Sequence, residues 1–153
     1  MNEFERFEKA FTFDLDKVLF NVWSNPRVQN FIIELNTEGQ PTSQLFEKGE
    51  DSLGVSLGEY SPFTVQLKVN KGQRIDHITL KDTGEFYESF DITPFRNGFL
   101  ITANPIKDQD NLFVEYGEDI VGLSDQNKII LCESQIFREA LIQEAKKALS
   151  QFR

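Results

Sequence analysis

Two aspartates near the N-terminus, Asp14 and Asp16, have residue types and a spacing that could do chemistry. They stand in the stretch TFDLDKVLF, residues 12–20. One carboxylate can attack a phosphate ester and carry the phosphoryl group, while a second carboxylate beside it donates and accepts the proton. Such a pair needs a loop that presents both side chains to one substrate.

The spacing Asp-x-Asp-x-Val at residues 14–18 resembles that of haloacid-dehalogenase-type phosphatases. The resemblance implies that Asp14 is a nucleophile and Asp16 an acid–base, on a loop after a strand, with GLSDQN (122–127) in place of the magnesium-binding segment. Here the pattern lies inside a helical repeat, and no lysine between the two stretches has the context of a phosphate-binding residue. We therefore expect both aspartates on a solvated helix face, and a magnesium-dependent phosphatase is the alternative hypothesis.

The other reactive side chains favour structural roles. His77 is the only histidine and lies in a polar loop, which predicts a surface position. Cys132 is the only cysteine, so an internal disulfide is excluded, and it falls on the apolar face of the last helix, where it would act as a core residue. Asp108 and Asp110 do not follow the twelve-residue calcium loop. We expect no catalytic residue, no metal and no cofactor.

Composition limits the classes of partner. The chain has 153 residues and a formal net charge of −9, which argues against tight binding to nucleic acid, since that needs clustered Lys and Arg. No apolar run approaches the roughly 18 residues that span a bilayer, and the acidic N-terminus is unlike a signal peptide. We expect a protein made in the cytoplasm without a membrane partner.

The N-terminal third has a helical pattern. Apolar residues recur every three or four positions over residues 3–23, which predicts an amphipathic helix. Asn25 and Pro26 are typical of the cap and first turn of a second helix. Residues 49–62 are rich in glycine and predict a long loop.

The rest of the chain mixes strands and helices. Residues 62–69 alternate like a strand, although Ser61 and Pro62 are a good helix start, so both assignments stay open. Segments 90–94 and 98–103 predict a β-hairpin with its turn at Asn97-Gly98, and Ser124 begins a helix of roughly 25 residues. The prediction is a single α+β domain, residues 1–153: a helical part (1–48), a β-rich part with a small antiparallel sheet and a long loop (49–123), and a long C-terminal helix (124–153).

The stretch ITLKDTGEFYESF, residues 78–90, predicts a structural corner. Asp82 could cap a short helix, with Glu85 reaching back to the cap amide. Phe86 and Phe90 are four residues apart and would both face the core. Gly84 in the first turn indicates an unusual backbone angle or a close approach to another element. The corner serves packing, because no side chain in it is placed to move a proton.

In its context this corner resembles the bacteriophage virion-morphogenesis family of tail-completion and head–tail joining proteins. That family has an aromatic residue, Ser or Pro, Thr and Lys in one segment, and Leu, Thr-Gly, an aromatic residue and Ser in the next. The matching residues here are Tyr60, Ser61, Pro62, Thr64 and Lys68, then Leu80, Thr83, Gly84, Phe86 and Ser89. FVEYGEDIVGLSDQN, residues 113–127, is similar to a later segment of the family.

The resemblance implies a non-enzymatic virion protein, made in the host cytoplasm, that forms a ring in the phage neck or tail. Its partners would be copies of itself and other neck, portal or tail proteins, around a lumen through which DNA passes without being held. We expect the basic loop 68–74 to meet an acidic surface of the next subunit; the interface candidates are Lys68, Lys71, Arg74, Tyr60, Thr83 and Gly84. A regulatory or anti-host binding module with the same fold is a third hypothesis.

Overall fold

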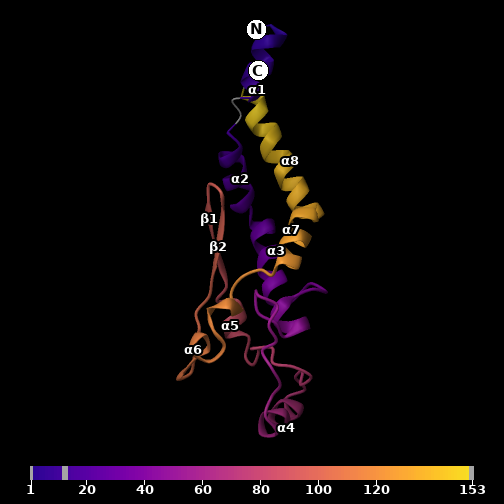
Figure 1. Ribbon diagram of the computed structural model, residues 1–153, viewed down its shortest axis with the longest axis vertical. Helices are drawn as coiled ribbons and strands as arrows, with labels where there is room; N and C mark the ends of the chain where they lie inside the picture. Colours follow the sequence, from indigo (N-terminus) through magenta and orange to yellow (C-terminus); the bar gives the residue numbers. More distant parts are fainter. Residues whose placement is uncertain (1, 12–13, 152–153) are drawn as a thin grey trace.

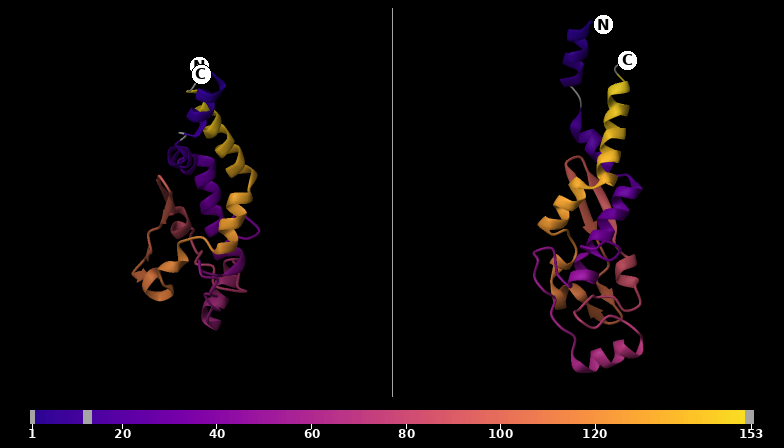
Figure 2. Two further views of the ribbon diagram at one scale, coloured as in Figure 1. Left: turned by 45° about the horizontal axis from the view of Figure 1, so that its top comes forward. Right: turned by 90° about the vertical axis from the view of Figure 1, so that its right-hand side faces the viewer.

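The computed structural model describes residues 2–11 and 14–151, and it shows an elongated α+β protein (Figure 1). The mixed fold with a long C-terminal helix agrees with the predicted class. Helices α1 (Glu3–Phe11), α2 (Leu15–Trp23) and α8 (Gln135–Ser150) lie toward one end, and α4 (Pro62–Asn70) lies at the other. Seen from the side, α4 runs across the long axis of the molecule (Figure 2).

The N-terminal helix predicted over residues 3–23 is two helices. α2 begins after Asp14, whose Oδ1 accepts from the backbone N–H of Lys17 at 3.1 Å. A short polar side chain in that place satisfies one of the free amides at a helix start, and this favours a new helix over a continuous one. The apolar stripe is also less buried than predicted, since Phe4 is 69% exposed.

The second helix begins as predicted. In α3 (Pro26–Asn36), Asn25 is the cap, with its Oδ1 accepting from Arg27 N at 2.9 Å, and Pro26 is the first residue of the helix. Its buried residues Val28, Ile32 and Leu35 are spaced by three and four, so one face of α3 enters the core.

Aromatic side chains form the centre of the core. The ring of Trp23, at the end of α2, lies 5.0 Å from that of Phe99 and 5.3 Å from that of Phe137, between centroids. Phe99 comes from a hairpin and Phe137 from α8, so one tryptophan joins three elements. Together with α3, these elements make the part that we call the aromatic core.

The hairpin consists of β1 (Asp91–Phe95) and β2 (Gly98–Thr102), antiparallel, with Phe95 opposite Gly98. The predicted strands are confirmed, but the turn is wrong by one position, because it uses Arg96 and Asn97 and leaves Gly98 in the strand. Burial alternates along both strands, and the buried face packs against α2. A second pair, β3 (Ile106–Lys107) and β4 (Asp110–Asn111), is only two residues long in each strand.

The segment 62–69, which the sequence left open, is helical. Ser61 caps α4, its hydroxyl accepting from Thr64 N at 3.2 Å, and Pro62 occupies the first turn. The cap and the proline outweigh the strand-like alternation. Four helical segments are only three to five residues long: η1 (Gln44–Lys48), α5 (Glu85–Glu88), α6 (Leu112–Tyr116) and η2 (Glu118–Ile120).

The prediction of one continuous C-terminal helix of roughly 25 residues is wrong, because the segment forms two helices. Ser124 caps α7 (Asp125–Glu133) as predicted, but Ser134 has extended backbone, ψ 147°, and separates α7 from α8. The Ser134 hydroxyl accepts from Phe137 N at 3.1 Å and so caps α8. The break changes which side chains face inward: Cys132, predicted to be a core residue, is exposed.

Three buried side-chain amides connect the N-terminal third of the chain to its C-terminal third. The side chains of Asn36, Gln44 and Asn127 are almost wholly inaccessible, and each bonds to backbone far away in the chain. Asn36 Nδ2 donates to Ile120 O at 3.1 Å and its Oδ1 accepts from Gly122 N at 2.7 Å. Gln44 bonds Gly122 O and Ser124 N, and Asn127 bonds Leu35 O and Thr42 O. These bonds satisfy backbone groups that no regular ladder reaches.

Candidate binding cleft

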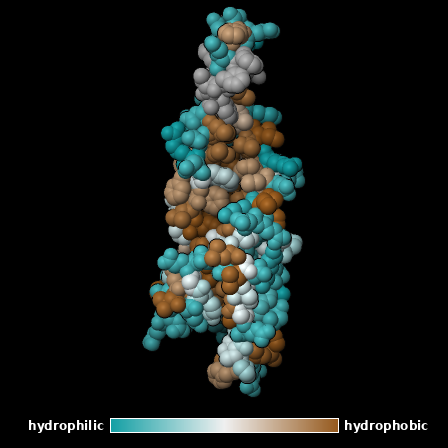
Figure 3. Space-filling model, in the orientation of Figure 1, coloured by the Kyte–Doolittle hydropathy of each residue, from teal (hydrophilic) through white to brown (hydrophobic). Residues whose placement is uncertain are grey.

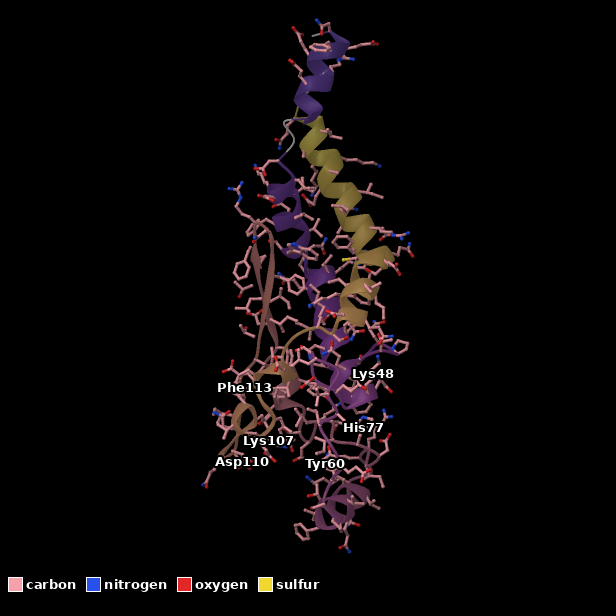
Figure 4. All side chains as sticks on the ribbon, in the orientation of Figure 1. Lys48, Tyr60, His77, Lys107, Asp110 and Phe113 are labelled. Atoms are coloured by element: carbon pink, nitrogen blue, oxygen red, sulfur yellow. The ribbon has the colours of Figure 1, made fainter. Side chains whose placement is uncertain are left out.

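A cleft of about 320 Å³ opens between α4 and the arm formed by β3, β4 and α6. Tyr60 lies on the α4 side of it, and Lys107 and Asp110 lie on the arm (Figure 4). Its floor comes from segment 78–82, part of the stretch predicted to be a structural corner. The cleft therefore brings together three of the predicted interface residues, Tyr60, Lys68 and Lys71.

The backbone has one positive φ angle in the floor and another just after it. Leu80 has φ 57°, which is rare for a residue with a branched side chain, and its side chain is buried. Gly84 has φ 93° and is the N-cap of α5, so the predicted unusual angle is confirmed. Asp82 is not the cap, contrary to the prediction. Phe86 and Phe90 are buried as expected, with ring centroids 5.2 Å apart.

Hydroxyl groups hold the floor in this shape. The backbone N–H of Thr79 donates to the hydroxyl of Tyr60 at 2.9 Å, and the hydroxyl of Tyr87 donates to Thr79 O. Burial, with the negative charge of Glu38 as a smaller cause, raises the pKa of Tyr87 above its ordinary value. Tyr87 therefore stays a neutral donor at physiological pH. We call this network, together with Lys68, Gln73 and Asp82, the polar corner.

Lys68 is the most unusual member of the polar corner. It is only 8% exposed, although a lysine is almost never buried without a partner. Its ammonium donates to Lys81 O at 2.9 Å and to Gln73 Oε1 at 3.2 Å, and it lies 4.8 Å from the centre of the Tyr60 ring. The protons of Lys68 are thus used inside the chain, where the charge ties α4 to the floor of the cleft.

The other cations of the basic loop are also paired within the chain. Lys71 Nζ lies 2.8 Å from Asp82 Oδ1, and Lys107 Nζ lies 3.6 Å from the other oxygen of that carboxylate. The hydrogen bond from Lys71 is the main reason that the pKa of Asp82 is lowered to about 2. Arg74 makes two bonds to Asp76, at 2.6 and 3.0 Å, and one to Glu47 at 3.0 Å. All of these carboxylates belong to the same chain as the lysines and the arginine.

His77 is half-buried, which corrects the predicted surface position. Its side chain is 15% exposed, its Nε2 lies 2.7 Å from Phe46 O, and its Nδ1 lies 3.2 Å from Asp76 Oδ2. The ring packs against Gly49, where an added Cβ would come within 2.5 Å of His77 Cδ2. His77 therefore connects η1 to the basic loop.

Asp14 and Asp16 lie far from the cleft residues in sequence, and both stand at the start of α2. Besides capping the helix, Asp14 pairs through Oδ2 with Arg96 in the hairpin turn, at 3.1 Å. Asp16 is an exposed residue of the first helical turn, as the solvated-face hypothesis expected. An acid in this turn is favourable for the helix dipole.

Part of the cleft was missed by sequence reasoning. Tyr116 and Asp108 line the arm side, and burial raises the pKa of Tyr116 to about 12. Asp108 has φ 54°, so it forms the turn between β3 and β4. The stretch KDQD could have indicated a turn, but its position opposite α4 depends on contacts far apart in sequence.

Neither a metal-ligand cluster nor a membrane-spanning helix occurs in the part of the chain that the structure describes. Across residues 2–11 and 14–151, no three His, Cys, Asp or Glu side chains gather as a metal site requires. No helix within those same ranges has the length and apolar character needed to cross a membrane.

The cleft thus offers a mixed surface whose lysines bond to carboxylates or carbonyls of the same chain, flanked by Tyr60, Leu67, Ile78 and Tyr116. Such a lining suits contact with another surface, since its lysines already have partners. Comparison with known proteins gives no family model, no curated protein and no solved structure that matches this chain.

Proposed function

We propose that this protein is a structural subunit of the neck or tail of a bacteriophage, which forms a ring by head-to-tail contact with copies of itself. Its role would be to join head and tail or to complete the tail, beside other neck, portal or tail proteins. The sequence resemblance supplies the class of virion protein. The exposed apolar surface of α4 is the observation that supports ring formation.

The burial pattern of α4 is the reverse of the usual one, in which apolar side chains are buried and charged ones exposed. Its only buried residue is Lys68, whereas Phe63, Leu67 and Val69 are 71%, 47% and 55% exposed. Exposed apolar residues are unremarkable singly, but a short helix that leaves three large apolar side chains exposed has a surface for another chain.

The apolar residues of α4 lie on two flanks. Successive residues of an α-helix are rotated by about 100°, so Thr64 and Lys68 share the direction that faces the body. Phe63 and Leu67 then lie roughly 100° to one side, and Val65 and Val69 roughly 100° to the other. A head-to-tail ring needs two different contact surfaces on opposite sides of each subunit, as α4 provides.

The opposite end of the molecule has uncovered apolar side chains too. Leu15 and Phe20 of α2 are 53% and 38% exposed, and Ile142 and Leu149 of α8 are 53% and 47% exposed. Figure 3 shows apolar side chains along one face from the upper helices to the lower tip. A subunit that touches its neighbours along much of its length would cover them.

The interface proposed here differs from the one expected from sequence. Lys68, Lys71 and Arg74 have partners inside the chain, so α4 replaces the basic loop as the main contact surface. Tyr60 belongs to the polar corner, and Gly84 to the cap of α5. The net charge of −9 supports a lumen that repels DNA and lets it pass. No structural observation favours the phosphatase alternative with Asp14 and Asp16.

The test compares substitutions on one helix. Val69→Asp places a charge on an apolar flank, and Gln66→Asp places the same charge on an exposed position between the flanks. We expect concentrated wild-type protein and Gln66→Asp to form annular particles by light scattering and negative-stain electron microscopy. Val69→Asp should lose them while keeping its circular dichroism spectrum. Wild-type protein without annular particles, or rings that persist in Val69→Asp, would contradict the proposal.

A further inference from the structure

The two outer edges of the hairpin differ in what their backbone can bond. In an antiparallel pair, residues alternate between positions that bond across the pair and positions whose N–H and C=O point outward. Pro94 has no N–H, and the two-residue turn makes Phe95 and Gly98 a bonded pair. The outward-pointing residues are therefore Ile92 and Pro94 on β1, and Phe99 and Ile101 on β2.

The outer edge of β1 has no N–H to offer. Pro94 lacks one, and the N–H of Ile92 donates to the Oδ1 of Asp91 at 2.9 Å. β1 is also the strand that packs against α3. Proline and charged side chains on an edge strand are common ways in which proteins block a sheet edge.

The outer edge of β2 is unprotected. Its sequence, GFLIT, has neither a charge nor a proline, and within the described residues the outward N–H and C=O groups of Phe99 and Ile101 have no hydrogen-bond partner. The hairpin lies at the margin of the molecule (Figure 1). Leu100, between the two residues, is 50% exposed. A neutral strand with free backbone groups is a template for another strand.

We infer that β2 pairs with β2 of a second copy, antiparallel, across a two-fold axis. A hairpin-to-hairpin chain in one direction is ruled out by the blocked edge of β1, whereas two copies of β2 present identical donors and acceptors. The self-pairing that uses all outward groups sets Phe99 opposite Ile101 of the second copy. Leu100 then faces its own counterpart on the axis, and no like charges meet there.

This two-fold contact is separate from the flanks of α4, so it does not rest on the ring. It would cover the open edge in the free protein and produce a four-stranded sheet from two hairpins. Combined with the proposed ring contacts, the same pairing would join two rings back to back.

Cysteine crosslinking tests the register. Facing residues at a position without cross-strand bonds have Cα atoms about 4.5 Å apart, within the range of a disulfide. In the Cys132→Ser background, Leu100→Cys should therefore form a disulfide-linked dimer under mild oxidation. Thr93→Cys is the matched control, since it stands opposite Leu100 on β1 and is also exposed. Its counterpart would be roughly 14 Å away, three strand spacings, and should stay unlinked.

A charge substitution tests the same contact in solution. Wild-type protein at low concentration should have twice the mass of the 17.7 kDa chain, and Leu100→Lys should reduce it to that of one chain. Thr93→Lys should stay dimeric, and so should Val69→Asp, which removes only the ring contacts. A wild-type monomer, or equal crosslinking of Leu100→Cys and Thr93→Cys, would overturn the pairing and leave the ring proposal untouched.

Discussion

The aromatic core is held by apolar contacts between rings and aliphatic side chains, whereas the polar corner is held by hydrogen bonds to backbone. Around Trp23, the contacts come from α2, α8 and β2, each of which has a regular apolar face. In the polar corner, the backbone of Thr79, Lys81 and Asp82 bonds to two hydroxyls, an ammonium and a side-chain amide from scattered positions. The first kind of contact depends on volume, and the second on the direction of each bond.

The difference has consequences for how each region fails. Apolar packing loses stability in proportion to the volume removed, and neighbouring side chains can shift to fill part of a gap. A buried hydrogen bond has no such adjustment, since a carbonyl that loses its donor stays unpaired. Substitutions matched in position can therefore separate the two regions.

The largest effect is expected in the aromatic core. Trp23→Ala removes the ring between Phe99 and Phe137 and should lower the free energy of unfolding by about 3–5 kcal/mol. Urea titration followed by circular dichroism measures it. Phe63→Ala, at a position 71% exposed, is the control and should change stability by less than about 0.5 kcal/mol in the monomer. Equal losses would mean that Trp23 is not a central contact.

A smaller loss is expected in the polar corner. Tyr87→Phe keeps the ring but removes the donor to Thr79 O, so the free energy of unfolding should fall by about 1–3 kcal/mol. Tyr116→Phe removes a hydroxyl from a half-buried position and should cost less. If both variants unfold at the wild-type urea concentration, the hydroxyl network does not stabilise the corner.

Backbone shape should contribute less again. Gly84→Ala puts a Cβ at φ 93°, where its nearest neighbour is Glu88 Oε1 at 4.0 Å, so the loss of about 1 kcal/mol is conformational rather than steric. Gly98→Ala, with open space and no positive φ, should leave stability unchanged or slightly raised. Thermal unfolding of the two variants gives the comparison, which fails if Gly98→Ala is the worse one.

The smallest effect concerns pH. The folded pKa of Asp82, about 2, lies below the value of about 3.9 in an unfolded chain, so the ionised form stabilises the fold above about pH 4. That contribution is lost as pH falls through 2. The stability difference between wild type and Asp82→Asn should be about 1 kcal/mol or less near neutral pH, because Lys71 is half exposed, and should vanish toward pH 2. A difference independent of pH would assign the effect to something other than ionisation.

Local patterns predicted much of the aromatic core and little of the polar corner. The Asn25 cap, the hairpin strands and the Ser124 cap depend on residues near each other in sequence, and all are confirmed. The break at Ser134 was also predictable, since a serine that bonds the amide three residues later is an ordinary cap. The apolar spacing continues through Ser134, so the segment was interpreted as one helix and the cap was overlooked.

The candidate cleft depends on contacts that no local pattern gives. Lys68 is buried because Lys81 O, thirteen residues away, points toward it across a backbone turned at Leu80. An aliphatic residue there would have been assigned to the core, but a lysine in FTVQLKV is typical of an exposed face. Predicting it requires the partner carbonyl, and hence the tertiary fold.

The three buried amides set the order in which the protein can mature during synthesis. The side chains of Asn36 and Gln44 bond to Ile120, Gly122 and Ser124. The carbonyl of Leu35 accepts from Asn127, which is synthesised 92 residues later. A ribosome needs on the order of ten seconds to add that many residues. Through that interval the first third of the chain leaves the exit tunnel with its polar groups unmatched, so the nascent protein completes its fold only when its C-terminal third has emerged.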